Sequence, residues 1–206
     1  PLALGDVPPD RDDLADLLAL PEEGEQRDLV GGELLARSRA GGLAREGDFR
    51  QVDRLAVGLM NRGLKPHDFV LLQLPNWHEY IYTFFALQKI GAVTVLLIPR
   101  HGQLEINHLA GLTKPKAWIL PEQYGKIEYQ PIMDDVLKKN PQIKIIIQAR
   151  AKGPGDHLNL DSVIEEAELT PENLKALDDL RPDPDEVSHI MPTGGTTGLP
   201  KASPRT

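Results

Sequence analysis

Residues 193–201 read Thr193-Gly194-Gly195-Thr196-Thr197-Gly198-Leu199-Pro200-Lys201 and follow a short apolar run at residues 187–191. Glycine can take positive φ and lets the backbone approach a ligand closely, and successive N–H groups in such a turn converge on anions. The threonine hydroxyls add hydrogen-bond donors. Pro200 fixes φ just before Lys201, whose ammonium group suits phosphate. The stretch therefore predicts a polyphosphate-binding loop at the end of a strand.

The alternative to a phosphate-binding loop is an ordinary solvent-exposed turn, which a cluster of glycine and threonine also favours. Spacing excludes two better-known phosphate loops. The stretch has neither the Gly-Lys pair of a Walker A loop nor the G-x-G-x-x-G pattern of a dinucleotide site.

The six histidines of the chain offer no metal site by spacing. His78-Glu79 is not continued into H-E-x-x-H. His101 and His108 are seven residues apart, and we expect both to be solvated polar residues rather than ligands. His189 alternates with apolar neighbours, and we expect it to pack within a strand rather than contact a ligand.

Composition places the chain among ordered globular proteins. It has 206 residues, of which 40% are hydrophobic and 26% charged. The net charge of −8 and the pI of about 5.3 argue against nucleic acid and anionic membranes as partners. The absence of cysteine excludes disulfides, thiolate metal sites and a cysteine nucleophile. The sequence shows no apolar run of about 18 residues and no signal-peptide pattern, so a cytoplasmic protein is the default expectation.

Strands and helices alternate from residue 47 onward. Apolar residues at helical spacing predict helices at residues 49–60, 77–90, 103–112, 129–137, 161–168 and 171–180. Short apolar or β-branched runs predict strands at residues 69–74, 93–98, 117–120, 143–147 and 187–191. The two helices at 161–168 and 171–180 are acidic, and we expect them to lie on the surface.

The alternation predicts an α/β fold with a mostly parallel sheet and right-handed crossovers. Ligands of such sheets bind beyond the carboxyl ends of the strands, where residues 193–201 fall. Residues 1–46 show no steady period and are expected to be a poorly defined N-terminal extension, while residues 47–206 form the α/β subdomain that ends in the phosphate loop. Asn76 is expected to cap the helix that follows, and Trp77 to lie in the core.

The glycine-rich stretch resembles the signature loop of the adenylate-forming enzymes, the AMP-binding superfamily of acyl- and aryl-CoA ligases. The family pattern is roughly Ser/Thr-Gly-Ser/Thr-Thr-Gly-x-Pro-Lys after a strand. The form at residues 194–201 and the continuation Pro204-Arg205-Thr206 are similar to aryl-acid-activating members. Leu74-Pro75-Asn76-Trp77 and Gly91-Ala92-Val93 also resemble the family, and the resemblance covers about residues 47–206.

The resemblance implies the N-terminal part of the large domain of an adenylate-forming enzyme. It implies activation of a carboxylic acid by ATP with Mg²⁺, which yields an acyl-adenylate and pyrophosphate, followed by thioester formation with coenzyme A or with a carrier-protein thiol. The acid would be a small molecule, aromatic or alicyclic.

The resemblance also implies which residues bind the cofactor. The β- and γ-phosphates of ATP would be held by Thr193, Gly194, Gly195, Thr196, Thr197 and Gly198. Lys201 would offset charge on the departing pyrophosphate. No catalytic or metal-binding residue is assigned, because the acid pocket, adenine site and lid lysine of the family are expected beyond Thr206. The chain is therefore expected to be a fragment that is inactive alone.

Two other interpretations stay open at this point. The chain could be a non-catalytic α/β module that binds phosphate, or a truncated product with no independent activity.

Overall fold

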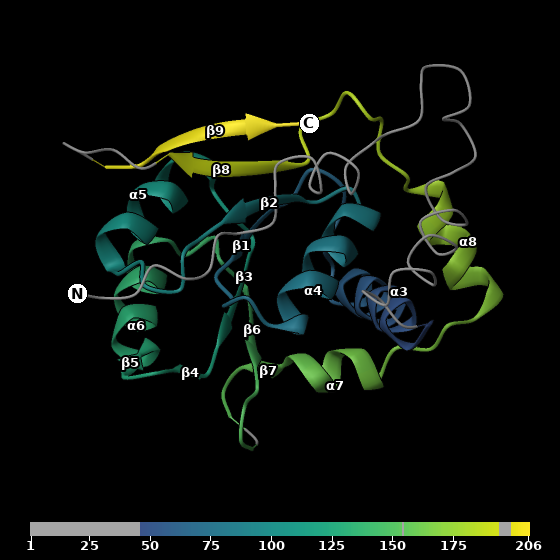
Figure 1. Cartoon of the computed structure of the whole chain (residues 1–206), viewed down its shortest axis with the longest axis horizontal. Coiled ribbons are helices and arrows are strands. Elements are labelled where there is room, and N and C mark those ends of the chain that lie inside the picture. Colours follow the sequence, from purple (N-terminus) through teal and green to yellow (C-terminus); the bar gives the residue numbers. More distant parts are fainter. Residues whose placement is uncertain (1–45, 154, 194–198) are drawn as a thin grey trace, which may run out of the picture. The chain divides into compact units, whose positions relative to one another are not determined.

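A computed structural model describes residues 46–153, 155–193 and 199–206 (Figure 1). The helices are α3 (Glu46–Asn61), α4 (His78–Lys89), α5 (Gln103–Thr113), α6 (Tyr129–Lys139), α7 (Leu160–Glu165) and α8 (Pro171–Asp179). The strands are β1 (Phe69–Leu72), β2 (Val93–Leu96), β3 (Ala117–Pro121), β4 (Gln123–Tyr124), β5 (Ile127–Glu128), β6 (Ile145–Ala149), β7 (Leu158–Asn159), β8 (His189–Thr193) and β9 (Lys201–Arg205). The expected extension over residues 1–46 falls almost entirely outside the described residues and stays a prediction.

Seven of these strands form one sheet in the order β7-β6-β3-β1-β2-β8-β9. Its neighbouring strands pair in parallel except β8 and β9, which are antiparallel. The short strands β4 and β5 pair only with each other, as an antiparallel hairpin. The prediction of an α/β fold with a mostly parallel sheet is confirmed.

Different helices cover the two faces of the sheet (Figure 1). α3, α4 and α7 pack on one face, and α5 and α6 pack on the other. In β1, Val70 and Leu72 belong to the first core cluster and Leu71 to the second, as the period of two along a strand requires. All three side chains are fully buried. Burial on both faces explains why the strands of this sheet appear in the sequence as unbroken apolar runs.

The acidic segment around α7 differs from its prediction. Leu160, Val163 and Ile164 are buried and join the core cluster beneath α3 and α4, so the expected surface position of residues 161–168 is wrong for this helix. The spacing i, i+3, i+4 of these apolar residues outweighs the surrounding acidic charge. In α8 Leu177 is the one buried residue, so most of this second acidic helix is on the surface as expected.

A close crossing of α3 and α7 depends on Gly58. A Cβ added to Gly58 would lie 2.4 Å from the carbonyl oxygen of Val163 and 2.8 Å from its Cγ1. Alanine at this position would therefore push α3 and α7 apart. Gly111, in α5, has open space around a built Cβ.

These two helical glycines give a matched pair for a stability test. Gly58→Ala should lower the free energy of unfolding by about 1–3 kcal/mol through overpacking. Gly111→Ala should raise it by about 0.5–1 kcal/mol, because alanine is the better helix former. Urea denaturation of both variants measures the difference, and equal changes in the two would contradict the crossing described above.

Candidate phosphate site at the carboxyl edge

The parallel strands all end at one edge of the sheet, and β8 ends there at Thr193. β9 begins at Lys201 and runs back along β8, so that Thr193 and Lys201 are direct partners in the antiparallel ladder. Both residues are exposed. Two of the seven predicted phosphate-binding residues thus lie opposite each other at the edge where α/β sheets bind ligands.

The other five predicted residues lie outside the described residues: Gly194, Gly195, Thr196, Thr197 and Gly198. Their part in phosphate binding stays a prediction. The pairing of Thr193 with Lys201 does fix where the segment between them starts and ends.

The segment after the glycines contacts α5. The Nε2 atom of His108 lies 3.1 Å from the carbonyl oxygen of Pro200. His108 is half-buried, so the expectation of a solvated residue is wrong for it. No local pattern predicts this contact, because the two residues are 92 positions apart.

A buried amide holds the segment after β2. Gln73 is fully buried, and its Nε2 atom lies 3.3 Å, 3.4 Å and 3.0 Å from the carbonyl oxygens of Ile98, Pro99 and His101. The Tyr129 hydroxyl donates a 2.9 Å hydrogen bond to the Pro99 carbonyl, and burial raises the pKa of Tyr129 to about 12. Sequence reasoning missed Gln73, although a single amide inside the apolar run 69–74 was the signal available.

His101 also departs from its expectation. It is half-buried, and burial lowers the pKa of its imidazole below the ordinary value. Its Nδ1 atom is buried without a hydrogen-bond partner among the described residues. His189 lies in β8 as expected, where its ring packs edge-on against Phe84 of α4.

Trp77 belongs to a charged cluster at the same edge rather than to the core. It is half-buried at the N-terminus of α4, and the Arg150 guanidinium lies 3.7 Å over its ring. Tyr124 meets Trp77 edge-on, with 6.0 Å between ring centroids. Trp77 is itself the N-cap residue, so the expected cap by Asn76 is also absent. The prediction of a core position is wrong because the ring stacks on a cation at the rim.

Glu79 holds this cluster in place through its ion pair with Arg150. Its carboxylate is buried, and Arg150 donates to it from Nε at 2.7 Å and from Nη2 at 3.1 Å. Burial alone would raise the pKa of Glu79, but the hydrogen bonds from Arg150 and the nearby positive charges outweigh it and hold the pKa below its ordinary value. Arg150 adopts a left-handed backbone with φ of 57°, which places its side chain over α4.

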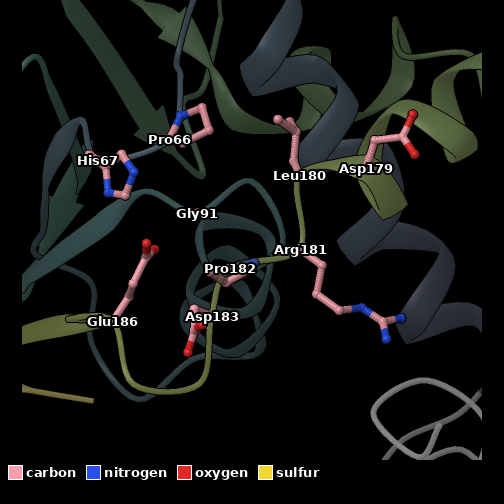
Figure 2. A pocket seen from close by; sticks show the side chains of 9 residues that line it. All are labelled: Pro66, His67, Gly91, Asp179, Leu180, Arg181, Pro182, Asp183 and Glu186. Atoms are coloured by element: carbon pink, nitrogen blue, oxygen red, sulfur yellow. The ribbon is translucent and has the colours of Figure 1, made fainter. Parts of the chain in front are cut away.

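A cavity of about 210 Å³ lies at the opposite, amino edge of the sheet (Figure 2). Its walls come from the segments before β1, β2 and β8 and from the end of α8; the lining residues are Pro66, His67, Gly91, Asp179, Leu180, Arg181, Pro182, Asp183 and Glu186. The acidic side chains extend from separate parts of the wall in Figure 2. No group of residues that could hold a metal ion is found within the described ranges. The cavity contains none of the predicted phosphate-binding residues.

Comparison with known proteins agrees with the geometry of the carboxyl edge. The AMP-binding enzyme family matches residues 49–206. The chain belongs to this family. The match confirms the resemblance drawn from the glycine-rich stretch, and it begins within α3 and runs through β9.

Relatives in the AMP-binding family include aryl-acid ligases. The 2,3-dihydroxybenzoate-AMP ligase of Bacillus subtilis is 34% identical over 163 residues, which cover 79% of this chain and 28% of the relative. The salicyl-AMP ligase / salicyl-S-ArCP synthetase of Mycobacterium tuberculosis is 29% identical over 81% of this chain and 28% of its own length. The apo structure of MbtA from Mycobacterium smegmatis superposes with a TM-score of 0.64 at 27% identity, over 77% of this chain and 28% of that one.

The chain spans little more than a quarter of the length of these relatives. Among the residues that the structure describes, no helix is long and apolar enough to cross a membrane.

The ion pair between Glu79 and Arg150 predicts a pH-dependent stability. Arg150→Met leaves a buried carboxylate without its cation, which should cost about 1–3 kcal/mol at neutral pH. The folded-state pKa of Glu79 is depressed in the parent chain, so its contribution is present at neutral pH and is lost as pH falls through that pKa. The difference in unfolding free energy between parent and variant should therefore shrink as the pH falls through the folded-state pKa of Glu79.

Urea denaturation at several pH values measures this difference. Arg181→Met is the control, because Arg181 is exposed and its hydrogen bonds within the described residues come from its backbone. A difference that stayed constant with pH would show that Arg150 acts through packing on Trp77 alone.

Proposed function

We propose that this chain supplies the pyrophosphate-binding part of an ATP-dependent, AMP-forming carboxylate ligase. The proposal rests on the direct pairing of Thr193 with Lys201 at the carboxyl edge. The residues between these two resemble the phosphate loop of the AMP-binding family, to which the chain belongs. Lys201 is exposed at this edge, so its ammonium group is accessible to a polyphosphate from solvent.

In this proposal the chain's own groups act on the β- and γ-phosphates of ATP. The backbone N–H groups and threonine hydroxyls of residues 193–198 donate hydrogen bonds to phosphate oxygens, and Lys201 offsets the charge that develops on the departing pyrophosphate. The carboxylate of the acid attacks the α-phosphorus, the bond between that phosphorus and the bridging oxygen breaks, and pyrophosphate leaves with the electron pair. Mg²⁺ bound to the phosphates of ATP would share the neutralisation of this charge with Lys201.

We further propose a small aromatic carboxylic acid as the substrate. Support comes from the relatives, whose names specify 2,3-dihydroxybenzoate and salicylate. The adenylate then passes to a thiol, that of coenzyme A or of a carrier protein. The name of the Mycobacterium tuberculosis relative supports the carrier, since it describes a salicyl-S-ArCP synthetase.

The proposed role of Lys201 is testable by binding alone. The chain should bind pyrophosphate with a dissociation constant on the order of millimolar, because a few charge-assisted hydrogen bonds must offset the entropy of association. Lys201→Ala should weaken binding roughly tenfold. Phosphorus NMR titration with pyrophosphate measures both constants.

Lys65→Ala is the matched control for this titration. Lys65 is exposed and precedes β1, at the opposite edge of the sheet, so its removal changes the net charge equally without touching the proposed site. Equal losses in the two lysine variants would reduce the effect to general electrostatics and contradict a local phosphate site.

Catalysis should need more of the family's length than this chain spans. Adenylation requires the acid to be held in line with the α-phosphate by further groups. We therefore expect no acid-dependent ATP–pyrophosphate exchange from the 206-residue chain with benzoates. A protein of family length that carries this chain should exchange, and Lys201→Ala should slow it. Exchange by neither protein, together with intact pyrophosphate binding, would favour the non-catalytic phosphate-binding module.

A further inference from the structure

The peptide group between Pro200 and Lys201 lies just outside the β8–β9 ladder. Among the described residues the ladder starts at the pair Thr193 and Lys201, and Pro200 has no partner there. Proline also lacks an N–H group and cannot extend the ladder by donating. The carbonyl of Pro200 is instead reached by His108, at 3.1 Å from Nε2. A carbonyl oxygen only accepts hydrogen bonds, so Nε2 carries the proton and donates it.

The backbone that carries His108 is held firmly in place. Its neighbours Ile106, Leu109 and Ala110 are fully buried against the sheet. Asn107, the preceding residue, donates to Asp135 of α6 at 2.7 Å and accepts from Asn140 at 2.7 Å. α5 is thus fixed against both the sheet and α6, and His108 projects from a rigid base.

The orientation of the Pro200 carbonyl determines where the backbone of Lys201 begins. A peptide group is planar, so anchoring the carbonyl of Pro200 also fixes the plane that contains the nitrogen and Cα of Lys201. The next residue, Ala202, packs against the same core cluster as α5. The entry to the loop is fixed separately, because Thr193 is the last residue of β8, which pairs with β2 on one side and with β9 on the other. Each end of the loop therefore has its own anchor, and the anchor at the exit is a side chain.

We propose that His108 is a positioning residue for the phosphate site. Its Nε2–H group fixes the Pro200–Lys201 peptide and thereby the direction in which Lys201 leaves the loop before phosphate binds. This inference rests on the proposed function of Lys201. His108 touches no phosphate itself and acts through the lysine.

Three substitutions separate the hydrogen bond from the bulk of the ring. His108→Leu removes the donor. His108→Gln places an amide N–H at about the reach of Nε2, whereas His108→Asn has a donor that is too short. Leu and Asn should weaken pyrophosphate binding roughly two- to tenfold, as the loss of one hydrogen bond predicts, and Gln should bind nearly as the parent chain does.

A double variant tests whether His108 acts through Lys201. In the Lys201→Ala background, His108→Leu should have no further effect on pyrophosphate binding, because the group it positions is gone. Unchanged binding in His108→Leu, failure of Gln to restore binding, or independent effects of the two substitutions would each overturn the proposal. Thermal unfolding of each variant checks that the chain is folded.

A measurement without ligand keeps this inference distinct from the proposed function. In ¹H–¹⁵N spectra the backbone amide of Lys201 should shift in the Leu and Asn variants and keep its position in the Gln variant. An unmoved amide in His108→Leu overturns the positioning role whatever pyrophosphate does. A parent chain that fails to bind pyrophosphate, but whose Lys201 amide responds as stated, overturns the proposed function and supports the contact between His108 and the loop exit.

Discussion

Parallel pairing is the constraint on which the rest of this structure depends. Parallel strands require each connection to return to the amino edge, so the chain from β1 to β8 places every strand end at one edge. Gln73 and Trp77 follow β1, Arg150 follows β6 and Thr193 ends β8, and all four residues still share that edge. The helices of the crossovers then cover both faces and leave the edges as the places for polar chemistry.

The one antiparallel pair of this sheet has a different role. β9 runs back along β8 and brings Lys201 level with Thr193, which a parallel crossover could not do within so few residues. The two strands on either side of the predicted phosphate-binding residues therefore pair with each other. The backbone at Lys201 is held by its pairing with Thr193 and, one residue earlier, by the contact between His108 and the Pro200 carbonyl.

The periodic parts of this fold were predictable from the sequence, and the rim of the site was not. The strands around Val70, Ile119 and Ile147 are apolar on both faces, which makes them visible without any knowledge of their partners. Trp77 carries no such signal, because its position depends on Arg150, a residue distant in sequence. For α7 the spacing of the apolar residues indicates a buried face, but the acidic residues around them favoured a surface position in the prediction. The motif predicted Thr193 and Lys201 as phosphate-binding residues. No pattern predicts the contacts of Gln73 and His108, because both side chains hydrogen-bond to backbone carbonyl groups, which every residue has.

The turn after β6 illustrates how tertiary contacts can choose a residue against its backbone preference. Arg150 holds a left-handed conformation, with φ of 57°, that costs a side-chain-bearing residue about 1 kcal/mol relative to glycine. Glycine would remove this strain but leave the buried Glu79 without a counter-ion, and the ion pair is worth more than the strain. The compensation exists only once α4 has docked, since Glu79 and Arg150 are 71 residues apart. The turn therefore gains its stability from long-range assembly rather than from the preference of its local sequence.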